Sequence, residues 1–166
     1  MNKLLLLALL ALTITSCGSS RKVSSSKEII TSRTETIPKR KAGKVVAHAK
    51  QFEGTRYKFG GTTKKGMDCS GLVYVAFQKE NIVMPRVSRD MATQGKRIRL
   101  NETDEGDLVF FQTNKNHRVI NHVGLVVENR KGDIMFIHST SSRGVIISSL
   151  SEKYWKDAFV EVRRII

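Results

Sequence analysis

One cysteine lies where a loop meets an apolar helix, in the stretch Gly66–Phe77. Asp68 is a favourable N-cap residue, and apolar side chains follow it at helical spacing, so we expect Cys69 in the first turn of a core helix. There the helix dipole and unpaired backbone N–H groups lower the pKa of a thiol from about 8.5 into a range of roughly 3.5 to 7.5. The negative charge of Asp68 acts against this effect. A buried cysteine that serves only as a small hydrophobic residue is the alternative.

The first residues have the pattern of an export signal. Lys3 precedes an apolar run over residues 4–14, which is too short to span a bilayer. The run is followed by two small residues and Cys17, a pattern that resembles the lipobox of bacterial lipoproteins. We therefore expect a lipoprotein signal peptide over residues 1–16, and acyl chains on Cys17 that hold the mature protein on a membrane. An ordinary secretory signal cut near the same place is the alternative.

Lipidation of Cys17 leaves a single thiol. The chain has two cysteines, so Cys69 then has no intrachain disulfide partner, and a lone thiol in an exported protein favours a catalytic role. The 166 residues carry a formal net charge of +14. Export favours anionic envelope polymers, lipid head groups or acidic peptides as partners. The aromatic and basic interleaving of single-strand binders is absent from the sequence, so we expect no nucleic-acid partner.

Residues 17–41 and 42–166 differ in composition. The segment Gly18–Lys41 is rich in Ser, Thr, Lys and Arg and lacks apolar periodicity, which is typical of a flexible tether. As a coil it spans about 25 to 30 Å on average and roughly 80 Å at full stretch. Residues 42–166 have a net charge of +8 and enough apolar pattern for one globular domain.

The apolar pattern changes from helical to extended along this domain. Helices are predicted at Lys44–Phe52, from Cys69 onward, from a cap at Ser88 to about Gly95, and for one turn after a cap at Ser151. Strands are predicted at Leu108–Phe111, Ile120–Val127, Ile134–Ile137, Val145–Ile147 and Phe159–Ile166. This order predicts an α+β domain, with N-terminal helices packed on one face of a mostly antiparallel sheet of about five or six strands.

Two histidines lie at the far ends of two predicted strands. His122 and His138 are equidistant from Arg130, in a connection with the composition of a hairpin loop. A hairpin that turns about Arg130 places them directly opposite on one face, with Cβ atoms about 4.5 to 5.5 Å apart. The same face then carries Gly124, Val126, Ile134 and Phe136. A cysteine nucleophile needs a base within reach and a partner that orients the base, so the pair is a candidate for both roles.

Other interpretations of the histidines stay open. His122 and His138 can be structural residues, or they can bind a zinc ion together with Cys69, although no paired ligand motif accompanies them. His117 lies in a polar loop, where solvent exposure or a substrate contact is expected. His48 lies in a predicted amphipathic helix and is expected to be an ordinary surface or edge residue.

Several short motifs follow one another from Gly54 to the end of the chain. They are Tyr57 with Gly60-Gly61, Asp68-Cys69-Ser70-Gly71, Pro85-Arg86, Gly106-Asp107-Leu108-Val109, His122-Val123-Gly124, and His138-Ser139-Thr140 followed by Gly144-Val145-Ile146. This ordered set resembles the NlpC-type family of papain-like cell-wall cysteine endopeptidases. The Asp-Cys-Ser-Gly, His-Val-Gly and later His are its specific part.

The resemblance implies that Cys69 is the nucleophile, His122 the general base, and His138 the residue that holds the imidazole in its useful tautomer. It also implies that the Tyr57 hydroxyl helps bind the developing oxyanion. Further residues that it places in the site or the substrate groove are Asp68, Ser70, Arg86 and Ser88. The chain departs from the family pattern at Asp90-Met91, so the outer subsites are not predicted.

The same resemblance implies that the substrate is a peptidoglycan stem peptide, and that no metal or other cofactor is needed. D-alanyl to diaminopimelate cross-links or D-glutamyl to diaminopimelate bonds are the implied targets. Together with Cys17, it leads us to expect a monomer that is lipid-anchored in a bacterial cell envelope, on the periplasmic side of the outer membrane. Two other functions stay open, a binding module that kept the fold without turnover and a papain-like acyltransferase that acts on lipid.

Overall fold

An antiparallel sheet forms the centre of the fold. In the computed structural model, residues 26–114, 119–130 and 132–166 are described. The strands are β1 (Thr62–Thr63), β2 (Gly66–Met67), β3 (Lys96–Ile98), β4 (Leu108–Phe111), β5 (His122–Arg130), β6 (Asp133–Thr140), β7 (Gly144–Ser149) and β8 (Phe159–Arg164). The helices are α1 (Ser26–Lys50), α2 (Cys69–Gln78), α3 (Ser88–Met91), the 3-10 helix η1 (Leu100–Glu102) and α4 (Lys153–Ala158). Six strands pair in the order β3-β8-β4-β5-β6-β7, and β1 and β2 form a separate ribbon.

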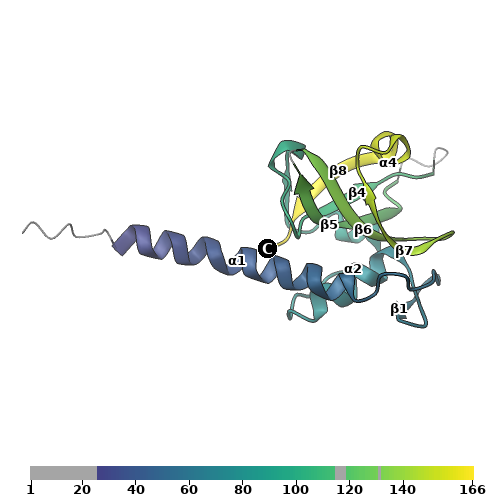
Figure 1. Ribbon diagram of the computed structural model, residues 1–166, viewed down its shortest axis with the longest axis horizontal. Helices are drawn as coiled ribbons and strands as arrows, with labels where there is room; N and C mark the ends of the chain where they lie inside the picture. The colour runs from purple at the N-terminus through teal and green to yellow at the C-terminus, as the bar shows by residue number, and fades with distance from the viewer. Residues whose placement is uncertain (1–25, 115–118, 131) are drawn as a thin grey trace, which may run out of the picture.

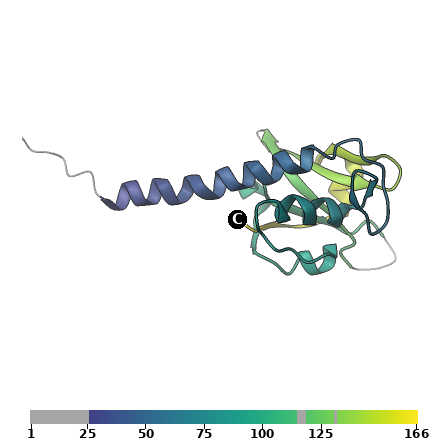
Figure 2. The ribbon, with the colours of Figure 1, turned by 90° about the horizontal axis from the view of Figure 1, so that it is seen from below.

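Apolar side chains fill both faces of the six-stranded sheet. Helices α1 and α2 cover one face, as Figures 1 and 2 show, and their apolar residues share one core cluster with Leu125 of β5. On the other face, Val126 belongs to a second cluster with Trp155 of α4. Successive residues of a strand point to opposite faces, so β5 contributes to both clusters. The predicted α+β class is confirmed, and α4 provides a second cover that the sequence did not predict.

The five predicted strands are all present, and β4 has the predicted bounds. The strand β3 and the ribbon of β1 and β2 were not predicted. β3 is three residues long, has no apolar run and pairs only with β8 at the edge of the sheet. Strands of two or three residues are too short to show the alternation on which a prediction depends.

Helix α1 begins well before the predicted helix. The sequence predicts a flexible tether up to Lys41, whereas α1 is continuous from Ser26 to Lys50. Its first part projects away from the domain (Figure 1). The flexible-coil prediction is therefore wrong for residues 26–41. The signal peptide, Cys17 and residues 18–25 lie outside the described part of the chain.

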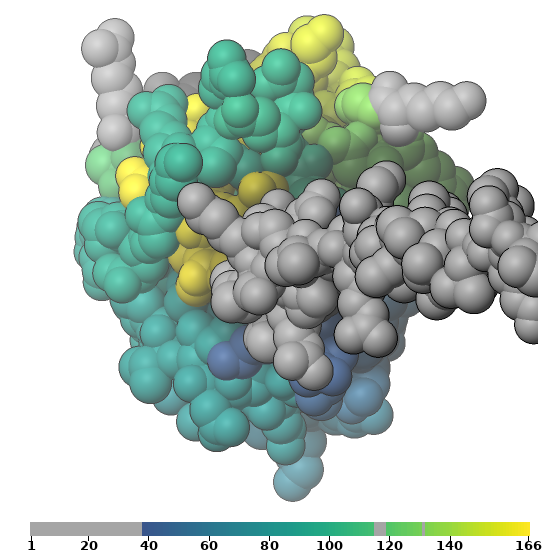
Figure 3. Space-filling model, turned by 90° about the vertical axis from the view of Figure 1, so that its left-hand side faces the viewer, coloured from purple at the N-terminus to yellow at the C-terminus, as the bar shows by residue number. Residues whose placement is uncertain are grey.

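The second half of α1 packs against the domain. Its buried apolar residues are Val45, Val46 and Ala49. Ala42 lies so close to Gly106 that a Cβ at position 106 would come within 2.5 Å of the Ala42 side chain. Nearby, the Arg164 guanidinium donates hydrogen bonds to both carboxylate oxygens of Asp107. On the face that Figure 3 presents, the yellow C-terminal segment lies beside the teal segment that precedes β4.

None of the helices in the described part of the chain is both long and apolar enough to cross a bilayer.

The N-terminus of α2 has the predicted cap. The Asp68 carboxylate accepts a hydrogen bond of 2.6 Å from the Gly71 N–H. The apolar residues that follow are fully buried, namely Leu72, Val73, Ala76 and Phe77. Gly71 has no room for a side chain, because a Cβ there would lie 2.1 Å from the Gly61 carbonyl oxygen. This close approach holds the loop before β1 against the first turn of α2, beside Cys69.

Two predicted N-caps are wrong. Ser88 is the buried first residue of α3, and Val87 occupies the cap position without a side-chain cap. That helix also ends at Met91, earlier than predicted. Ser151 lies before α4, and its hydroxyl is hydrogen-bonded to the hydroxyl of Ser149. A serine caps a helix only where its oxygen is free to accept from the first turn, and here local partners compete.

The hairpin of β5 and β6 has a different register from the predicted one. Val126 pairs with Phe136, not with Ile134, and a bulge follows Val126. His122 and His138 are therefore not directly opposite, and that prediction is wrong. The offset is two residues, and an offset of two keeps every side chain on its own face. Both imidazoles still meet on the shared face, as predicted.

Alanine substitutions at two helical glycines test the packing around α2. We expect Gly43→Ala to stabilise the protein by about 1 kcal/mol, because nothing lies within 4 Å of the new Cβ and alanine favours the helix. We expect Gly71→Ala to destabilise it by about 1 to 3 kcal/mol, because the new methyl group meets the Gly61 carbonyl. Chemical denaturation measures both. Equal stability of the two variants would contradict the close approach.

Candidate active site

Cys69 lies where two clefts meet. The first, which we call the His122 cleft, has a volume of about 410 Å³ and is lined by Tyr57, Cys69, Thr113, residues 121–122, residues 139–143, Glu152 and residues 154–155. The second, the Arg86 cleft, has a volume of about 560 Å³ and is lined by Tyr57, residues 59–60, 68–70, 86–89 and 119–121. Tyr57, Cys69 and Asn121 line both clefts. The thiol therefore borders both clefts.

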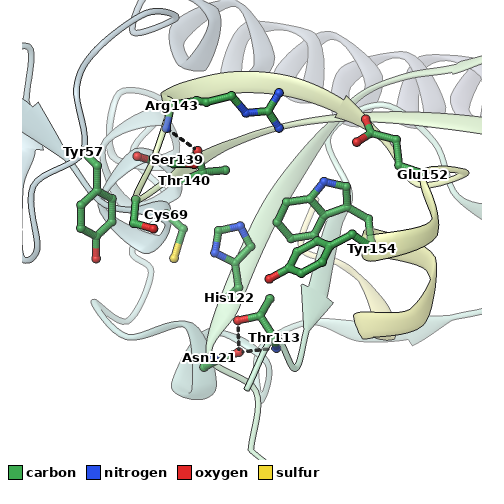
Figure 4. Close-up of a pocket in the computed structure, with 13 residues that line it drawn as sticks. Tyr57, Cys69, Thr113, Asn121, His122, Ser139, Thr140, Arg143, Glu152 and Tyr154 are labelled. Carbon is green, nitrogen blue, oxygen red and sulfur yellow. Dashed lines mark hydrogen bonds between the residues drawn. The ribbon is translucent and has the colours of Figure 1, made fainter. Parts of the chain in front are cut away.

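The thiol is positioned by α2 and faces β5. Figure 4 shows the sulfur of Cys69 beside the ring of His122, with both side chains in the His122 cleft. The backbone N–H of Val123, the next residue of β5, lies close enough to the sulfur to lower the pKa of the thiol. The first residue of a core helix and the first residue of a central strand therefore meet across the site.

The two histidines form a hydrogen-bonded chain with a serine. Nε2 of His122 lies 2.9 Å from Nδ1 of His138, and Nε2 of His138 lies 3.0 Å from Oγ of Ser148. The chain is self-consistent when each Nε2 donates, which leaves Nδ1 of His122 without a proton and able to accept one from Cys69. Ser148, on β7, was not predicted, because a serine near the end of a short strand gives no sequence signal for a contact with a distant histidine.

An indole encloses the imidazole pair. Trp155 stacks on His122 with ring centroids 5.3 Å apart at 21°, and it meets His138 edge-on at 4.5 Å and 84°. Trp155 is buried, and His138 is fully buried. The indole therefore keeps water from one side of both rings and fixes their planes. Its role was also not predicted, although the single tryptophan of the chain was a possible signal.

Burial determines the protonation of the imidazoles. Desolvation lowers the pKa of His122 to about 4. It also lowers the pKa of His138, and the nearby charges of His122 and Arg143 act in the same direction. Both rings are therefore neutral at neutral pH.

The thiol is also neutral in the resting site. Burial raises the pKa of Cys69, the backbone N–H of Val123 lowers it, and the charge of Asp68 raises it further. The backbone groups of the first turn of α2 lower it by less than burial raises it. The predicted lowering by backbone N–H groups is thus present but smaller than the cost of burying a thiolate, and the net prediction of a lowered pKa is wrong.

Three polar side chains support the first turn of α2. The Arg86 guanidinium donates to Oδ2 of Asp68 at 2.9 Å and to Oγ of Ser70 at 2.9 Å. It also donates to the Gly61 carbonyl, and the Gly60 N–H donates to Asp68. Asp68, Ser70 and Arg86 thus lie beside Cys69 as predicted, and Arg86 neutralises a carboxylate next to the thiol.

A hydrogen bond between distant segments holds the thiol at the sheet. The buried hydroxyl of Ser139 donates to the Met67 carbonyl at 2.7 Å, which joins β6 to the residues just before Cys69. Ser139 follows His138 directly in the sequence. Strand β6 therefore positions both the second imidazole and the segment just before Cys69. The sequence contains Ser139 in a motif but gives no indication of this contact.

Tyr57 extends into both clefts from the loop before β1. Figure 4 places its ring near Cys69, and 37% of the residue is exposed. Burial raises the pKa of the hydroxyl, and the charges of Cys69 and Asp68 raise it further. The hydroxyl therefore keeps its proton at neutral pH and is a hydrogen-bond donor.

The remaining candidate residues lie outside the group of residues around the thiol and the two imidazoles. Ser88 is buried and lines the Arg86 cleft. Asp90 is exposed and Met91 is fully buried in the core, so Met91 forms no outer subsite. His48 of α1 is hydrogen-bonded to Glu80, in the turn after α2, at 3.1 Å. The segment that contains residue 117 lies outside the described residues.

The zinc alternative finds no support in the geometry. Within the described ranges, no group of three or more His, Cys, Asp or Glu side chains is arranged to hold a metal ion. The nitrogen of His122 that faces away from the thiol is hydrogen-bonded to His138. The two histidines are thus hydrogen-bonded to each other, and His138 is also hydrogen-bonded to Ser148.

A thiol at the start of a core helix, facing an imidazole on an antiparallel sheet, is the layout of papain-like cysteine peptidases. This arrangement of thiol and imidazole assigns the protein to the papain-like class. The chain belongs to the NlpC/P60 family, whose sequence pattern it matches over residues 54–164.

The chain is similar to several curated proteins of that family. It is 40% identical over 117 residues to a Haemophilus influenzae protein named "Probable endopeptidase NlpC homolog", an alignment that covers 70% of this chain and 58% of that protein. It is 39% identical over 116 residues to the murein DD-endopeptidase MepS/murein LD-carboxypeptidase of Escherichia coli, which covers 69% of this chain and 58% of that protein. The chain therefore spans less than two thirds of the length of these relatives.

Solved structures share the fold. An NlpC/P60 family protein from Bacillus cereus superposes with a TM-score of 0.68 at 26% identity, over 75% of this chain and 40% of that one. An NLP/P60 family protein from Staphylococcus aureus, described as similar to lipoprotein, superposes with a TM-score of 0.66 at 32% identity, over 76% of this chain and 42% of that one. The similarity thus covers the domain that carries both clefts.

The buried histidines predict that stability falls in mild acid. Unfolded histidines bind protons near pH 6.5, whereas His122 in the folded protein stays neutral down to about pH 4. The pKa of His138 in the folded protein is also lowered. The unfolded state therefore binds more protons in this window, and the free energy of unfolding falls by about 1.4 kcal/mol per pH unit for each histidine. Denaturation between pH 7 and 4 measures the slope.

A variant isolates this contribution from other titrating groups. The unfolded and folded states differ in the number of protons they bind, and we expect His122→Asn to reduce this difference by about one proton. The free energy of unfolding should then fall less steeply with decreasing pH below about pH 6.5. An unchanged slope in the variant would show that His122 titrates normally in the folded protein.

Proposed function

We propose that this protein is a cysteine endopeptidase that hydrolyses amide bonds in peptidoglycan stem peptides or their cross-links. In this proposal Cys69 is the nucleophile, His122 the general base and His138 the residue that orients the base. The observation that carries it is the hydrogen bond between His122 and His138, which leaves Nδ1 of His122 toward the thiol in an open cleft.

Attack starts from a neutral pair. Because the thiol has a raised pKa and His122 a lowered one, the proton moves from Sγ to Nδ1 as the sulfur bonds to the substrate carbonyl carbon. The carbonyl oxygen becomes an oxyanion. The Cys69 backbone N–H and the Tyr57 hydroxyl are the donors that stabilise it in this proposal.

The leaving amine takes the same proton. The His122 imidazolium donates it to the amide nitrogen, the C–N bond breaks, and a thioester on Cys69 remains. A water molecule then attacks the thioester while His122 accepts a proton from it. The C–S bond breaks, the sulfur regains a proton from His122, and the carboxylic acid product leaves.

The second imidazole acts through the first. His138 is neutral and accepts from Nε2 of His122, so it stabilises the imidazolium that forms during the reaction. Ser148 in turn accepts from His138, and Trp155 limits the rotation of both rings. His138, Ser148 and Trp155 are positioning residues in this scheme.

The substrate class rests on relatives and on charge. The Escherichia coli relative is named a murein DD-endopeptidase and LD-carboxypeptidase, and another from Bacillus subtilis is named a bifunctional muramidase/DL-endopeptidase. A net charge of +8 over residues 42–166 favours carboxylate-rich stem peptides. These observations support D-alanyl to diaminopimelate and D-glutamyl to diaminopimelate bonds as the targets.

Digestion of purified peptidoglycan tests the proposal. We expect the wild-type protein to release new amine ends, detected by mass spectrometry, and Cys69→Ser to reduce the rate at least a thousandfold, because a hydroxyl beside a neutral imidazole is a much weaker nucleophile. Binding by both forms without cleavage would favour a binding module. Unchanged cleavage by Cys69→Ser would remove the thiol from the mechanism, and transfer of an acyl group to lipid would favour the acyltransferase.

We also propose that the protein is lipid-anchored through Cys17 in a bacterial envelope, on the periplasmic side of the outer membrane. The support is the lipobox-like sequence that ends at Cys17. We expect labelled palmitate to be incorporated by the wild type and by Cys69→Ala, which keeps Cys17, but not by Cys17→Ala. Label that persists in Cys17→Ala would reject this anchor.

A further inference from the structure

The His122 cleft has a cationic side chain on its rim. Among the described residues that line this cleft, Arg143 is the only Lys or Arg. Among the residues that the structure describes, its guanidinium has no hydrogen-bond or ion-pair partner. Most other arginines of the domain are engaged, such as Arg86 with Asp68 and Arg164 with Asp107. Arg143 therefore presents an uncompensated charge to whatever occupies the cleft.

The backbone that carries Arg143 is held in place. Its N–H donates to Oγ1 of Thr140 at 3.0 Å within the turn between β6 and β7. The next residue, Gly144, has a positive φ of 70° and packs so closely that a Cβ would lie 2.2 Å from the Thr55 carbonyl oxygen. The base of the side chain is thus fixed, and Figure 4 shows the side chain extending along the rim of the cleft, on the side of Glu152.

Glu152 places one negative charge in the same cleft. Its Oε1 accepts from the Ser149 N–H at 2.9 Å, so the carboxylate is also fixed. No salt bridge joins it to Arg143 in the described ranges of the chain. The cleft therefore favours one anionic group near Arg143 and disfavours a second one near Glu152.

The chemistry identifies which part of a substrate lies here. His122 lines this cleft and does not line the Arg86 cleft. Since its imidazolium delivers a proton to the leaving nitrogen, the residue that owns that nitrogen must lie on the His122 side of Cys69. Arg143 is thus on the leaving-group side of the scissile bond.

We propose that Arg143 binds a free carboxylate on the leaving residue and so selects amides whose leaving amine belongs to an amino acid with a free α-carboxylate. This inference rests on the proposed hydrolase function. It favours the D-alanyl to diaminopimelate cross-link, in which the carbon next to the leaving nitrogen carries a free carboxylate. A bond whose leaving residue continues as a peptide lacks that group.

Two matched peptides test the proposal. They share one scissile D-alanyl amide and differ only in the leaving residue, which carries either an α-carboxylate or an α-carboxamide. With the full-length wild type we expect kcat/KM to be roughly five- to tenfold higher for the carboxylate, the range for a charge-assisted pair in an open cleft. Arg143→Gln should remove this preference, with the larger loss of kcat/KM on the carboxylate peptide.

The control variant is Arg130→Gln, which removes the same charge from an exposed side chain at the far end of β5. It should keep the preference of the wild type. Equal loss on both peptides in Arg143→Gln, or a preference that survives in it, would overturn the assignment.

Binding separates this inference from the hydrolase function. Two proteins that cannot form a thioester are titrated with the same two peptides. They are the Cys69→Ala variant and the double variant Cys69→Ala/Arg143→Gln. Tighter binding of the carboxylate peptide that depends on Arg143 supports the proposal even if neither peptide is cleaved. Equal binding of both peptides to Cys69→Ala, together with equal rates in the wild type, rejects it.

Discussion

The hydrogen bond between the imidazoles of His122 and His138 is the interaction on which the site depends. Nε2 of His122 is occupied by the hydrogen bond to His138, so Nδ1 is the nitrogen that faces Cys69 and is available to the thiol. The bond exists because β5 and β6 pair with an offset that keeps both rings on one face, with Trp155 against them. A slip of a single residue would turn one ring to the opposite face and leave the thiol without a base.

Burial and not the helix dipole governs the charge state of this site. The end of α2 does lower the pKa of Cys69, but desolvation raises it by more, and desolvation lowers the pKa of His122. A neutral pair needs no buried charges at rest, which spares the folded protein their desolvation cost. In the proposed mechanism the ions form only when substrate is attacked, beside backbone N–H groups and His138.

The two clefts differ because different parts of the fold build them. The Arg86 cleft is made by the loops around α2 and α3, where Arg86 and Asp68 neutralise each other and apolar side chains such as Phe59 are exposed. The His122 cleft is made by the turn after β6 and the start of α4, where Arg143 has no partner in the described part of the chain. The hydrogen bond from Ser139 to the Met67 carbonyl joins these two halves of the molecule at the thiol.

Local patterns in the sequence were enough to predict the capped helix at Cys69, the five longer strands, and the shared face of His122 and His138. Each depends on residues within a few positions of one another, where side-chain periodicity and capping act directly. The bulge that sets the register, the contacts of Ser148 and Trp155, and the pKa of the thiol depend on segments that meet only in the folded chain. Packing and burial are properties of that assembled structure, so the sequence by itself determined which residues are candidates for the chemistry, and the tertiary structure decided how they are oriented and charged.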